Sequence, residues 1–390
     1  MELFKYNESR INKINAFMDA LLKSSTTEEK VNAYRTYEKD IEKMTPLDMF
    51  YLHHYSLDTD LSIDEIKKTA NKFINVFHKG LEKYSLQFNH SIIHLLNKES
   101  EKIEAHLNIL KEYYKSQKIV KYQKELLSGF KKCLEFELKF IKFENIIFPN
   151  LEDKLPSTKP FEVLWSLHDD ARGQLKKLIA LLEEDSINEK EIIERIGEYY
   201  YLVFGINQKE RLIILPLLEE LLSEDTLNQL FNESIEYGFV FMDKPEPLSI
   251  KESQSLNQHL YETKTGSLSH KQLSLVLNHI PVDITFVGKD DKVKYFNNRK
   301  ERHFPRNPSV IGRLVKHCHP PKSIHIVEKI VNDFKEGKRD FAEFWIEINN
   351  TFLYITYYAI RDKNGRYEGV LEVSQDVTHI RELKGEKRLL

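Results

Sequence analysis

The chain has 390 residues and a mass of 46.3 kDa, more than one ordinary hydrophobic core holds, so we expect two or three domains. The 58 basic and 61 acidic residues nearly cancel to a net charge of −3, which argues against a general attraction to nucleic acid. The longest apolar runs are far shorter than a membrane-spanning helix, and the N-terminus lacks the apolar core of a secretory signal. The two cysteines, Cys133 and Cys318, lie far apart in the sequence and provide no disulfide framework. We therefore expect a cytoplasmic protein.

Residues 1–85 have the pattern of a small helical domain. Apolar residues recur at helical spacing in SRINKINAFMDALL, VNAYRTYEKDIEKM and SIDEIKKTANKFINVFHKGLEKY. Thr45-Pro46 and the stretch 58–62 have the composition of breaks and caps between these helices.

Residues 86–242 have the pattern of a four-helix bundle. Helical periodicity runs over residues 89–115, 119–149, 160–183 and 188–220, and a shorter helix is expected near 224–240. The segment FENIIFP (143–149) is echoed by ERLIILP (210–216), and each copy ends the second helix of a predicted hairpin. This weak internal repeat favours two hairpins that pair with pseudo-symmetry.

Residues 243–268 are polar, contain two prolines and show no sustained periodicity, so they predict a linker with at most one short helix. The next residues change to β-branched and aromatic runs that predict five strands, VDITFVG, KVKYFNN, AEFWIEIN, TFLYITYYAIRD and YEGVLEVSQDV. Between the second and third strands, SIHIVEKIVNDFKEG predicts a helix that ends at Gly337. Residues 269–390 therefore predict an α+β domain with an antiparallel sheet.

The predicted order of strands and helix in residues 269–390 resembles that of a PAS sensor domain. DITFV (283–287), followed by VKYFN (293–297), resembles the opening hairpin of PAS folds. Asp376-Val377-Thr378 resembles the closing signature of the domain, after which we expect an exit helix over 379–390.

Further segments resemble one PAS subtype, which is fused to haemerythrin-like domains in bacteria. They are RHFPR (302–306), IGR (311–313) and KHCHPPKSIHIVEKIV (316–331). That subtype often follows a helical domain of unknown function, which TPLDMFYLHH (45–54) and KFINVFHKGLEKY (72–84) resemble more loosely. The resemblance thus implies a multidomain protein with an all-α N-terminal region and a C-terminal PAS domain.

The predicted bundle resembles the haemerythrin-like (HHE) family. VLWSLHDDAR (163–172) is similar to its third-helix motif and FENIIFP to its second-helix motif. The resemblance implies a non-haem di-iron site made of inward-pointing histidines and carboxylates. The candidate metal ligands in this chain are His94, Glu99, Glu144, His168 and Glu210, with Glu137 as a further carboxylate.

The bundle departs from the family's ligand set at two positions. Lys139 stands where we align a histidine of the second helix, and Arg211 replaces the expected glutamate of the fourth helix, with Glu210 shifted by one. Cations at ligand positions repel Fe²⁺, so we expect a degenerate metal site. The alternative structure for these residues is a buried charge network in which Lys139 and Arg211 pair with Glu144 or Glu99.

The densest cluster of ligating side chains is Lys316-His317-Cys318-His319-Pro320-Pro321. His319 or Cys318 could be a haem axial ligand, a thiol redox sensor or the wall of a ligand pocket. The alternative is a rigid Pro-Pro turn that precedes a helix, with Cys318 packed as a small apolar group. The candidate ligand- or haem-binding residues are His319, Cys318, His317, Arg302, His303 and Arg306, the last three forming a basic group suited to a carboxylate or propionate.

Together these features predict a cytoplasmic sensory or regulatory protein that binds a small ligand or haem through its PAS domain. We expect a homodimer through that domain, a protein partner that receives the signal, and no nucleic-acid partner. The alternatives are a non-haem iron protein that handles O₂, NO or peroxide, and a protein that binds or traffics haem. The cofactor stays open between haem and non-haem iron. No P-loop, Rossmann turn, kinase loop or Ser-His-Asp order is found, so an enzyme is not the favoured interpretation.

Overall fold

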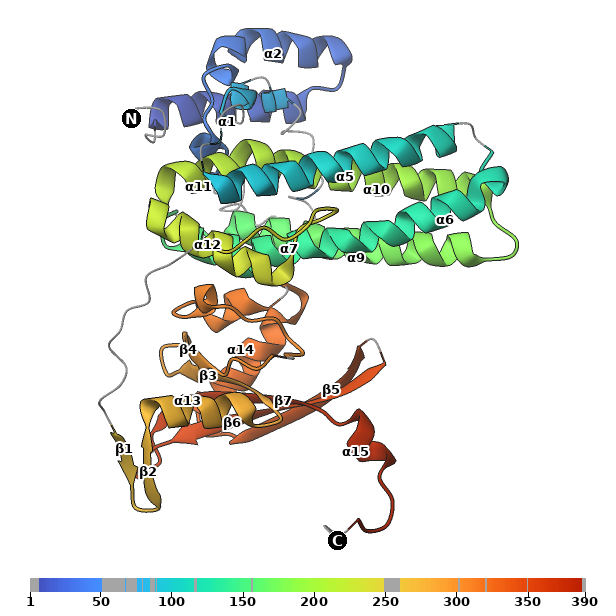
Figure 1. Ribbon diagram of the computed structural model, residues 1–390. Helices are drawn as coiled ribbons and strands as arrows, with labels where there is room; N and C mark the ends of the chain where they lie inside the picture. The colour runs from blue at the N-terminus through green and yellow to red at the C-terminus, as the bar shows by residue number, and fades with distance from the viewer. Residues whose placement is uncertain are drawn as a thin grey trace. The chain divides into compact units, whose positions relative to one another are not determined.

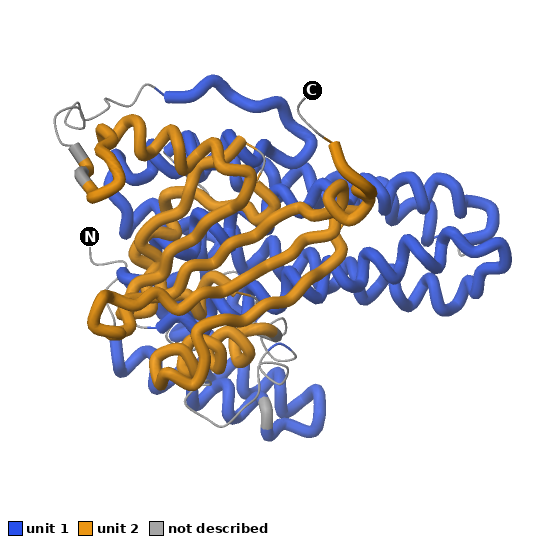
Figure 2. The backbone as a smooth tube through the Cα atoms, turned by 90° about the horizontal axis from the view of Figure 1, so that it is seen from below, with its two compact units in different colours: residues 1–249 blue, residues 250–390 orange. Residues whose placement is uncertain are grey.

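The structure is a computed structural model that describes residues 7–50, 67, 76–78, 80–84, 88, 90–115, 118–155, 157–248, 260–300, 302–319, 321–348 and 350–387. The chain divides into two compact units, Met1–Ser249 and Ile250–Leu390, which Figure 2 shows in different colours. The helix predicted over residues 62–84 lies largely outside the described residues, and the predicted separation of residues 1–85 from 86–242 stays a prediction. In the described part of the chain, no helix is long and apolar enough to cross a membrane.

Two amphipathic helices open the first unit, as the periodicity predicts. They are α1 (Glu8–Lys23) and α2 (Thr27–Ile41). Thr26 begins α2 with a capping box, in which its side chain and that of Glu29 each accept a backbone N–H. Ile14 and Phe17 of α1 are fully buried and belong to the same hydrophobic core as the long helices that follow.

Four long helical segments pack side by side in the described part of the first unit (Figure 1). The first is α5 (Ser91–Lys115) and the third is α9 (Lys159–Glu183). The second comprises η2 (Val120–Tyr122), α6 (Gln123–Lys132), η3 (Cys133–Phe136), α7 (Glu137–Lys142), η4 (Phe143–Ile147) and α8 (Phe148–Glu152). The fourth comprises α10 (Glu189–Lys209), η5 (Glu210–Ile214) and α11 (Leu215–Leu221), and the shorter α12 (Glu224–Tyr237) follows. These bounds agree with the predicted helices.

The internal sequence repeat coincides with a structural repeat. Both η4 and η5 are π-helical turns inserted into a long helix, and each is followed by a helix with a proline in its first turn, Pro149 and Pro216. Each π-turn carries a buried glutamate, Glu144 in one and Glu210 in the other. π-Turns are rare and are often found at functional sites, so this pair marks the interior between the helices as a candidate site.

The second unit is built on one five-stranded antiparallel sheet in the order β4-β3-β7-β6-β5. Its strands are β3 (Asp283–Gly288), β4 (Val293–Phe296), β5 (Phe341–Ile348), β6 (Thr351–Arg361) and β7 (Tyr367–Asp376). The helix α14 (Pro321–Lys335) packs Val327, Ile330 and Phe334 into the core of this unit. It stops before Gly337, whose φ of 70° lies in the left-handed region that glycine adopts without strain. The strands and this helix are those that the sequence predicts.

Three segments of the second unit differ from the prediction. The hairpin of β1 (Leu260–Thr263) and β2 (Gly266–Ser269) occupies the end of the predicted linker, of which residues 249–259 lie outside the described part. Helix α13 (His270–His279) was not predicted, although the capping pair Ser269 and Gln272 is a sequence signal for it. The exit helix α15 (Thr378–Glu382) is shorter than the predicted 379–390, because Leu383 is extended and Gly385 has a φ of 67°. Residues 388–390 lie outside the described part.

Candidate functional site

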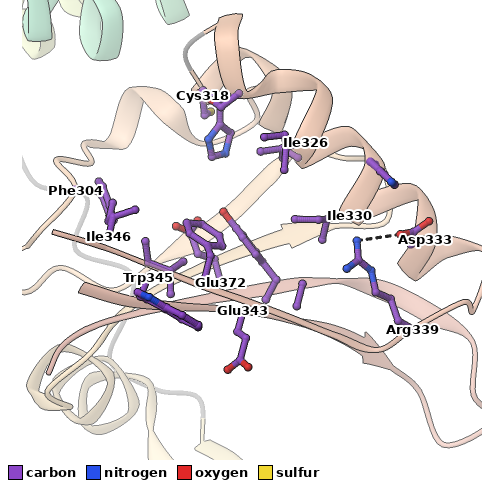
Figure 3. Close-up of a pocket in the computed structure, with 18 of the residues that line it drawn as sticks. Phe304, Cys318, Ile326, Ile330, Asp333, Arg339, Glu343, Trp345, Ile346 and Glu372 are labelled. Atoms are coloured by element: carbon purple, nitrogen blue, oxygen red, sulfur yellow. Dashed lines mark ion pairs between the residues drawn. The ribbon is translucent and has the colours of Figure 1, made fainter. Parts of the chain in front are cut away.

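A cavity of about 1070 Å³ lies between helix α14 and strands β5, β6 and β7 (Figure 3). Its wall is mostly apolar and is formed by Phe304, Ile326, Val327, Ile330, Ala342, Phe344, Ile346 and Ile355. A few polar side chains converge on the same space, namely Arg306, Cys318, His319, Ser323, Tyr357 and Glu372. A large apolar cavity with a few converging polar groups is the usual form of a small-molecule site.

The segment before α14 brings two predicted residues, His319 and Cys318, to this cavity. The short helix η7 (Val315–Cys318) ends there, and His319 continues in an extended conformation. The thiol of Cys318 lies 3.6 Å from the carbonyl oxygen of Leu314 and packs against the core of the unit. Cys318 is thus both a packing residue and part of the cavity wall.

His319 presents an uncharged imidazole to the cavity. Burial lowers the pKa of His319 to about 4, and the positive charges of Arg306 and Arg313 contribute to the same shift. An imidazole with such a pKa is neutral at pH 7, and one of its ring nitrogens then carries a lone pair. That nitrogen can accept a hydrogen bond or coordinate a metal centre.

Arg306 and Glu372 face each other at the cavity without a hydrogen bond between them. The distance from Arg306 Nη2 to Glu372 Oε2 is 3.8 Å, and the two side chains are only 11% and 12% exposed. Arg306 Nε is buried and has no hydrogen-bond partner in the described part of the chain. Tyr357 lies between Ala342 and Glu372 in the register of the sheet, and burial raises its pKa well above the usual value. The Nε–H group of Arg306 is therefore available to donate a hydrogen bond to a ligand.

The other three predicted ligand-binding residues do not line the cavity. Arg302 donates hydrogen bonds to the backbone carbonyl and to the side-chain oxygen of Asn297. The backbone N–H of His303 donates to the carboxylate of Asp283, and His317 lies in η7. The structure thus places Arg302 and His303 in a loop that they help to hold together, while Arg306 alone of the basic group reaches the cavity.

The predicted metal ligands of the first unit are brought together in part. His94 is exposed on α5, away from the interior. Glu137 pairs with Arg172, with 2.6 Å between Glu137 Oε2 and Arg172 Nε. The other four are buried in the interior of the helical segments, namely Glu99, Glu144, His168 and Glu210.

His168 lies at the centre of this buried group and bridges the two π-turns. Its Nδ1 is 2.9 Å from Glu144 Oε1, and its Nε2 is 3.2 Å from Glu210 Oε1. A neutral imidazole donates from one nitrogen only, so two carboxylate partners require the imidazolium form. Burial alone would lower the pKa of His168, but its hydrogen bonds to Glu144 and Glu210 outweigh that effect and raise the pKa. Phe140 stacks on the ring, with 4.4 Å between the ring centroids.

Two lysines of α7 neutralise the remaining buried carboxylates. Lys139 Nζ lies 2.5 Å from Glu210 Oε2 and donates to Asn207 Oδ1 at 2.8 Å. Lys142 Nζ lies 2.6 Å from Glu99 Oε1. All four charged side chains of these two pairs are fully buried. The interior therefore contains the kind of charge network that the sequence analysis gave as the alternative to a metal site.

The partners in this network are not the predicted ones. Lys139 pairs with Glu210 rather than with Glu144 or Glu99, while Glu144 pairs with Arg172 at 2.9 Å. Arg211 turns away from the centre and lies 3.7 Å from Glu104. The reason is the π-turn η5, which presents Glu210 to the interior and leaves Arg211 partly exposed.

The buried group does not fit a di-iron centre. Within the described residues, no cluster of three or more His, Cys, Asp or Glu side chains is arranged to hold a metal ion. The ammonium group of Lys139 occupies the contact to Glu210 that a metal would need, and both nitrogens of His168 face carboxylates. Fe²⁺ would have to displace these cations or be repelled by them.

The comparisons with known proteins identify the second unit. A family model described as a PAS domain matches residues 273–378. Those residues form the five-stranded sheet, α14 and the cavity, so this part of the chain is a PAS domain. A PAS domain suggests a role in sensing or signalling.

Individual relatives cover limited parts of the chain. The C-terminal domain of a protein from Streptococcus mutans has a solved structure that is 40% identical, covers 32% of this chain and 98% of that chain, and has a TM-score of 0.31. The PAS domain of a protein from Colwellia psychrerythraea is 16% identical over 28% of this chain and 97% of that chain, with a TM-score of 0.23. The exodeoxyribonuclease 7 large subunit of Mycoplasma mycoides subsp. mycoides SC is 35% identical over 140 residues, which are 35% of this chain and 28% of the length of that relative.

Proposed function

We propose that the protein is a cytoplasmic sensory protein that binds a small molecule in the cavity of its PAS domain. The observation that supports this most strongly is the cavity of about 1070 Å³, in which His319 and Arg306 are polar groups on a mostly apolar wall. A bound ligand would contact β7, from which the chain continues into the exit helix α15. Ligand binding would then shift the population of conformations that a partner protein recognises.

A cavity-filling variant tests this proposal on the full-length protein. Ile326 lines the cavity but is 53% exposed, so Ile326→Trp is expected to fold while reducing the space. Ile109→Trp, at a site on α5 that is 60% exposed, is the matched control. Native mass spectrometry of the purified protein should detect a bound small molecule that Ile326→Trp loses and Ile109→Trp keeps. Equal ligand content in both variants would contradict the proposal.

We propose haem as the first ligand to test in this cavity. The neutral imidazole of His319 supplies the kind of nitrogen that coordinates haem iron, and Arg306 could pair with a propionate. Titration of the protein with haemin should produce a Soret band that shifts or disappears in His319→Ala and persists in Cys318→Ser. A spectrum that is identical in wild type and His319→Ala would exclude His319 as the axial ligand.

We also propose that the PAS domain forms a homodimer through apolar residues that the described chain leaves uncovered. Helix α13 has no buried residue, and its Leu275 and Val276 are 48% and 51% exposed. On the edge strand β5, Phe341 and Trp345 are 41% and 59% exposed. Exposed apolar groups of this kind mark interaction surfaces. Light scattering should give a dimer for the full chain and a monomer for the double variant Leu275→Glu/Val276→Glu, with Lys271→Glu as the control. A monomeric wild type at high concentration would contradict the proposal.

For the helical bundle, we propose a haemerythrin-like fold in which internal ion pairs have replaced the metal site. The motif around His168 supports the family resemblance, and the positions of Lys139 and Lys142 support the loss of metal. The alternative, a non-haem iron protein that handles O₂, NO or peroxide, predicts stoichiometric iron. Metal analysis of protein purified without oxygen separates the two, because about two iron atoms per chain with an oxo-bridged spectrum would establish the alternative.

A further inference from the structure

The cavity of the PAS domain has one electropositive end, where Arg306 is the group with unused hydrogen-bonding capacity. Its Nε is buried without an acceptor in the described part of the chain, and its Nη2 is 3.8 Å from Glu372. A guanidinium presents its donors as a rigid fork that matches the two oxygens of a carboxylate. Leaving a buried donor unpaired costs free energy, so an acceptor placed at this point would be favoured.

The arginines near this end of the cavity differ in how they are paired. Arg299 is neutralised by Asp283 at 3.1 Å, but Arg302 donates to the backbone and side chain of Asn297 instead of to a carboxylate. Arg306 has Glu372 as its facing carboxylate, at a distance too long for a hydrogen bond. His319 adds no charge, because its lowered pKa keeps the imidazole neutral at pH 7. Arg306 is thus held by its facing carboxylate only loosely, and an added anion would supply an acceptor for its buried donor.

Five other charged residues line the cavity; four of them already have partners, and the fifth, Lys329, is exposed on α14. Asp333 is paired with Arg339 at 2.9 Å, and Lys338 with Glu336 at 2.5 Å. The carboxylate of Glu343 accepts a hydrogen bond from the hydroxyl of Tyr354 and points away from the space between helix and sheet (Figure 3). The remaining wall is apolar and comes from α14 on one side and from the strands on the other. The cavity thus combines one acid-binding end with a long apolar body.

We propose that the cavity takes an organic acid with an apolar body, whose carboxylate binds Arg306 in a bidentate manner and displaces Glu372 from it. This inference rests on the proposed function, since it names the ligand class of the same cavity. Two sources share this chemistry, a porphyrin with propionate groups and a long-chain fatty acid. In both, the acid group lies at the arginine and the apolar part lies along α14.

Matched pairs of acids and uncharged analogues test the ligand class on the full-length protein. Palmitate is compared with palmitamide, and haemin with its dimethyl ester, by isothermal titration calorimetry. We expect the acid of at least one pair to bind about tenfold or more tightly than its uncharged partner. The pair that shows the preference identifies the source of the acid.

Three variants and one control, Lys338→Gln, assign the preference to Arg306. Arg306→Gln should abolish the difference between acid and analogue, and Arg306→Lys, which keeps the charge but loses the fork, should retain part of it. Glu372→Gln should strengthen acid binding, because the competing carboxylate is removed. Lys338→Gln, which changes a cation at the cavity that already has a partner, should leave the preference unchanged. A purely structural role of Arg306 would weaken acid and analogue equally.

The outcomes separate this inference from the proposal on which it rests. Equal binding of acid and analogue by the wild type, or a preference that survives in Arg306→Gln, would overturn the acid-binding role while leaving the cavity as a ligand site. Weaker acid binding in Glu372→Gln would also overturn it. If neither member of either pair binds, the acid class fails, and the Ile326→Trp comparison then decides whether the cavity binds any ligand.

Discussion

The centre of the helical bundle and the cavity of the PAS domain both contain buried basic residues. Among the described residues, those at the centre of the bundle contact carboxylates at hydrogen-bond distance, whereas those at the cavity do not. In the bundle, His168 lies between two carboxylates, and Lys139 and Lys142 each contact a glutamate at hydrogen-bond distance. In the PAS domain, His319 is uncharged, and Arg306 retains a buried donor that has no acceptor among the described residues. Side chains that could bind a ligand form internal ion pairs in the bundle, whereas in the PAS domain they face the cavity. The difference lies in the side chains that surround each charged group, and residue type alone does not reveal these neighbours.

The largest expected effect comes from breaking the bundle network at Lys139. Lys139→Met leaves the carboxylate of Glu210 buried beside His168 without its ammonium partner. Removing one member of a buried ion pair costs about 3–5 kcal/mol, so we expect the free energy of unfolding to fall by roughly that amount. Denaturant unfolding of the full chain measures it.

A matched control for this variant is Lys131→Met. Lys131 pairs with Glu183 at 2.6 Å, but both side chains are 49% exposed. An exposed pair contributes about 0–1 kcal/mol. If Lys139→Met and Lys131→Met were equally stable, the buried network would not hold the bundle together.

Substitutions at two arginines of the PAS domain should lower the free energy of unfolding by smaller amounts. Arg302 satisfies the carbonyl and side-chain oxygens of Asn297, so Arg302→Met should lower the free energy of unfolding by about 1–3 kcal/mol. Arg306 makes no hydrogen bond to Glu372, so Arg306→Met should lower the free energy of unfolding by less than Arg302→Met does. Thermal unfolding of both variants checks the difference. A larger loss in Arg306→Met would show that Arg306 supports the fold.

Sequence patterns predicted the elements of both regions better than their interiors. Helical and strand periodicities are local, so the long helices and the sheet were predicted with nearly correct bounds. The phase of a π-turn is not contained in a periodicity of 3.6 residues, and for this reason Arg211 was expected at a position that Glu210 occupies. The position of Glu372, by contrast, can be predicted from the sequence. It follows buried Val370 by two residues, so strand alternation places its charged side chain on the inward face of the sheet.

The basic segment before α14 shows the same limit for loops. Arg302, His303 and Arg306 are close in sequence and chemically alike, and no periodicity ranks them. Only the tertiary structure separates Arg302, which binds the backbone, from Arg306, which lines the cavity. Loop residues with equivalent chemistry are therefore distinguished by their contacts.

The buried Lys209 should make part of the bundle's stability depend on pH. Burial lowers the pKa of Lys209 to about 7, against the opposing influence of Glu210. The unfolded chain then binds more protons than the folded one between about pH 7 and pH 10.4, so this residue's contribution to stability rises with pH in that window. Lys209→Met removes the dependence. The free energy of unfolding of Lys209→Met, taken relative to that of the wild type, should be higher at pH 7 than at pH 9 by on the order of 1–2 kcal/mol. Denaturant unfolding at both pH values measures this difference. A difference that is constant with pH would contradict the lowered pKa.

The smallest expected change in stability is that of His319→Ala, although its effect on ligand retention should be large. Its ring faces the cavity and is uncharged at neutral pH, so replacing it removes no ion pair and enlarges a space that already exists. We expect the free energy of unfolding to change by less than about 0.5 kcal/mol, while the ligand detected by native mass spectrometry is lost. Cys318→Ser is the companion variant, because its thiol packs against the core and lies near the carbonyl of Leu314. That variant should lower stability slightly more and keep the ligand. A His319→Ala protein with unchanged ligand content but a clearly lower melting temperature would place His319 with the packed residues, and the contrast between a satisfied bundle and an available cavity would then rest on Arg306 alone.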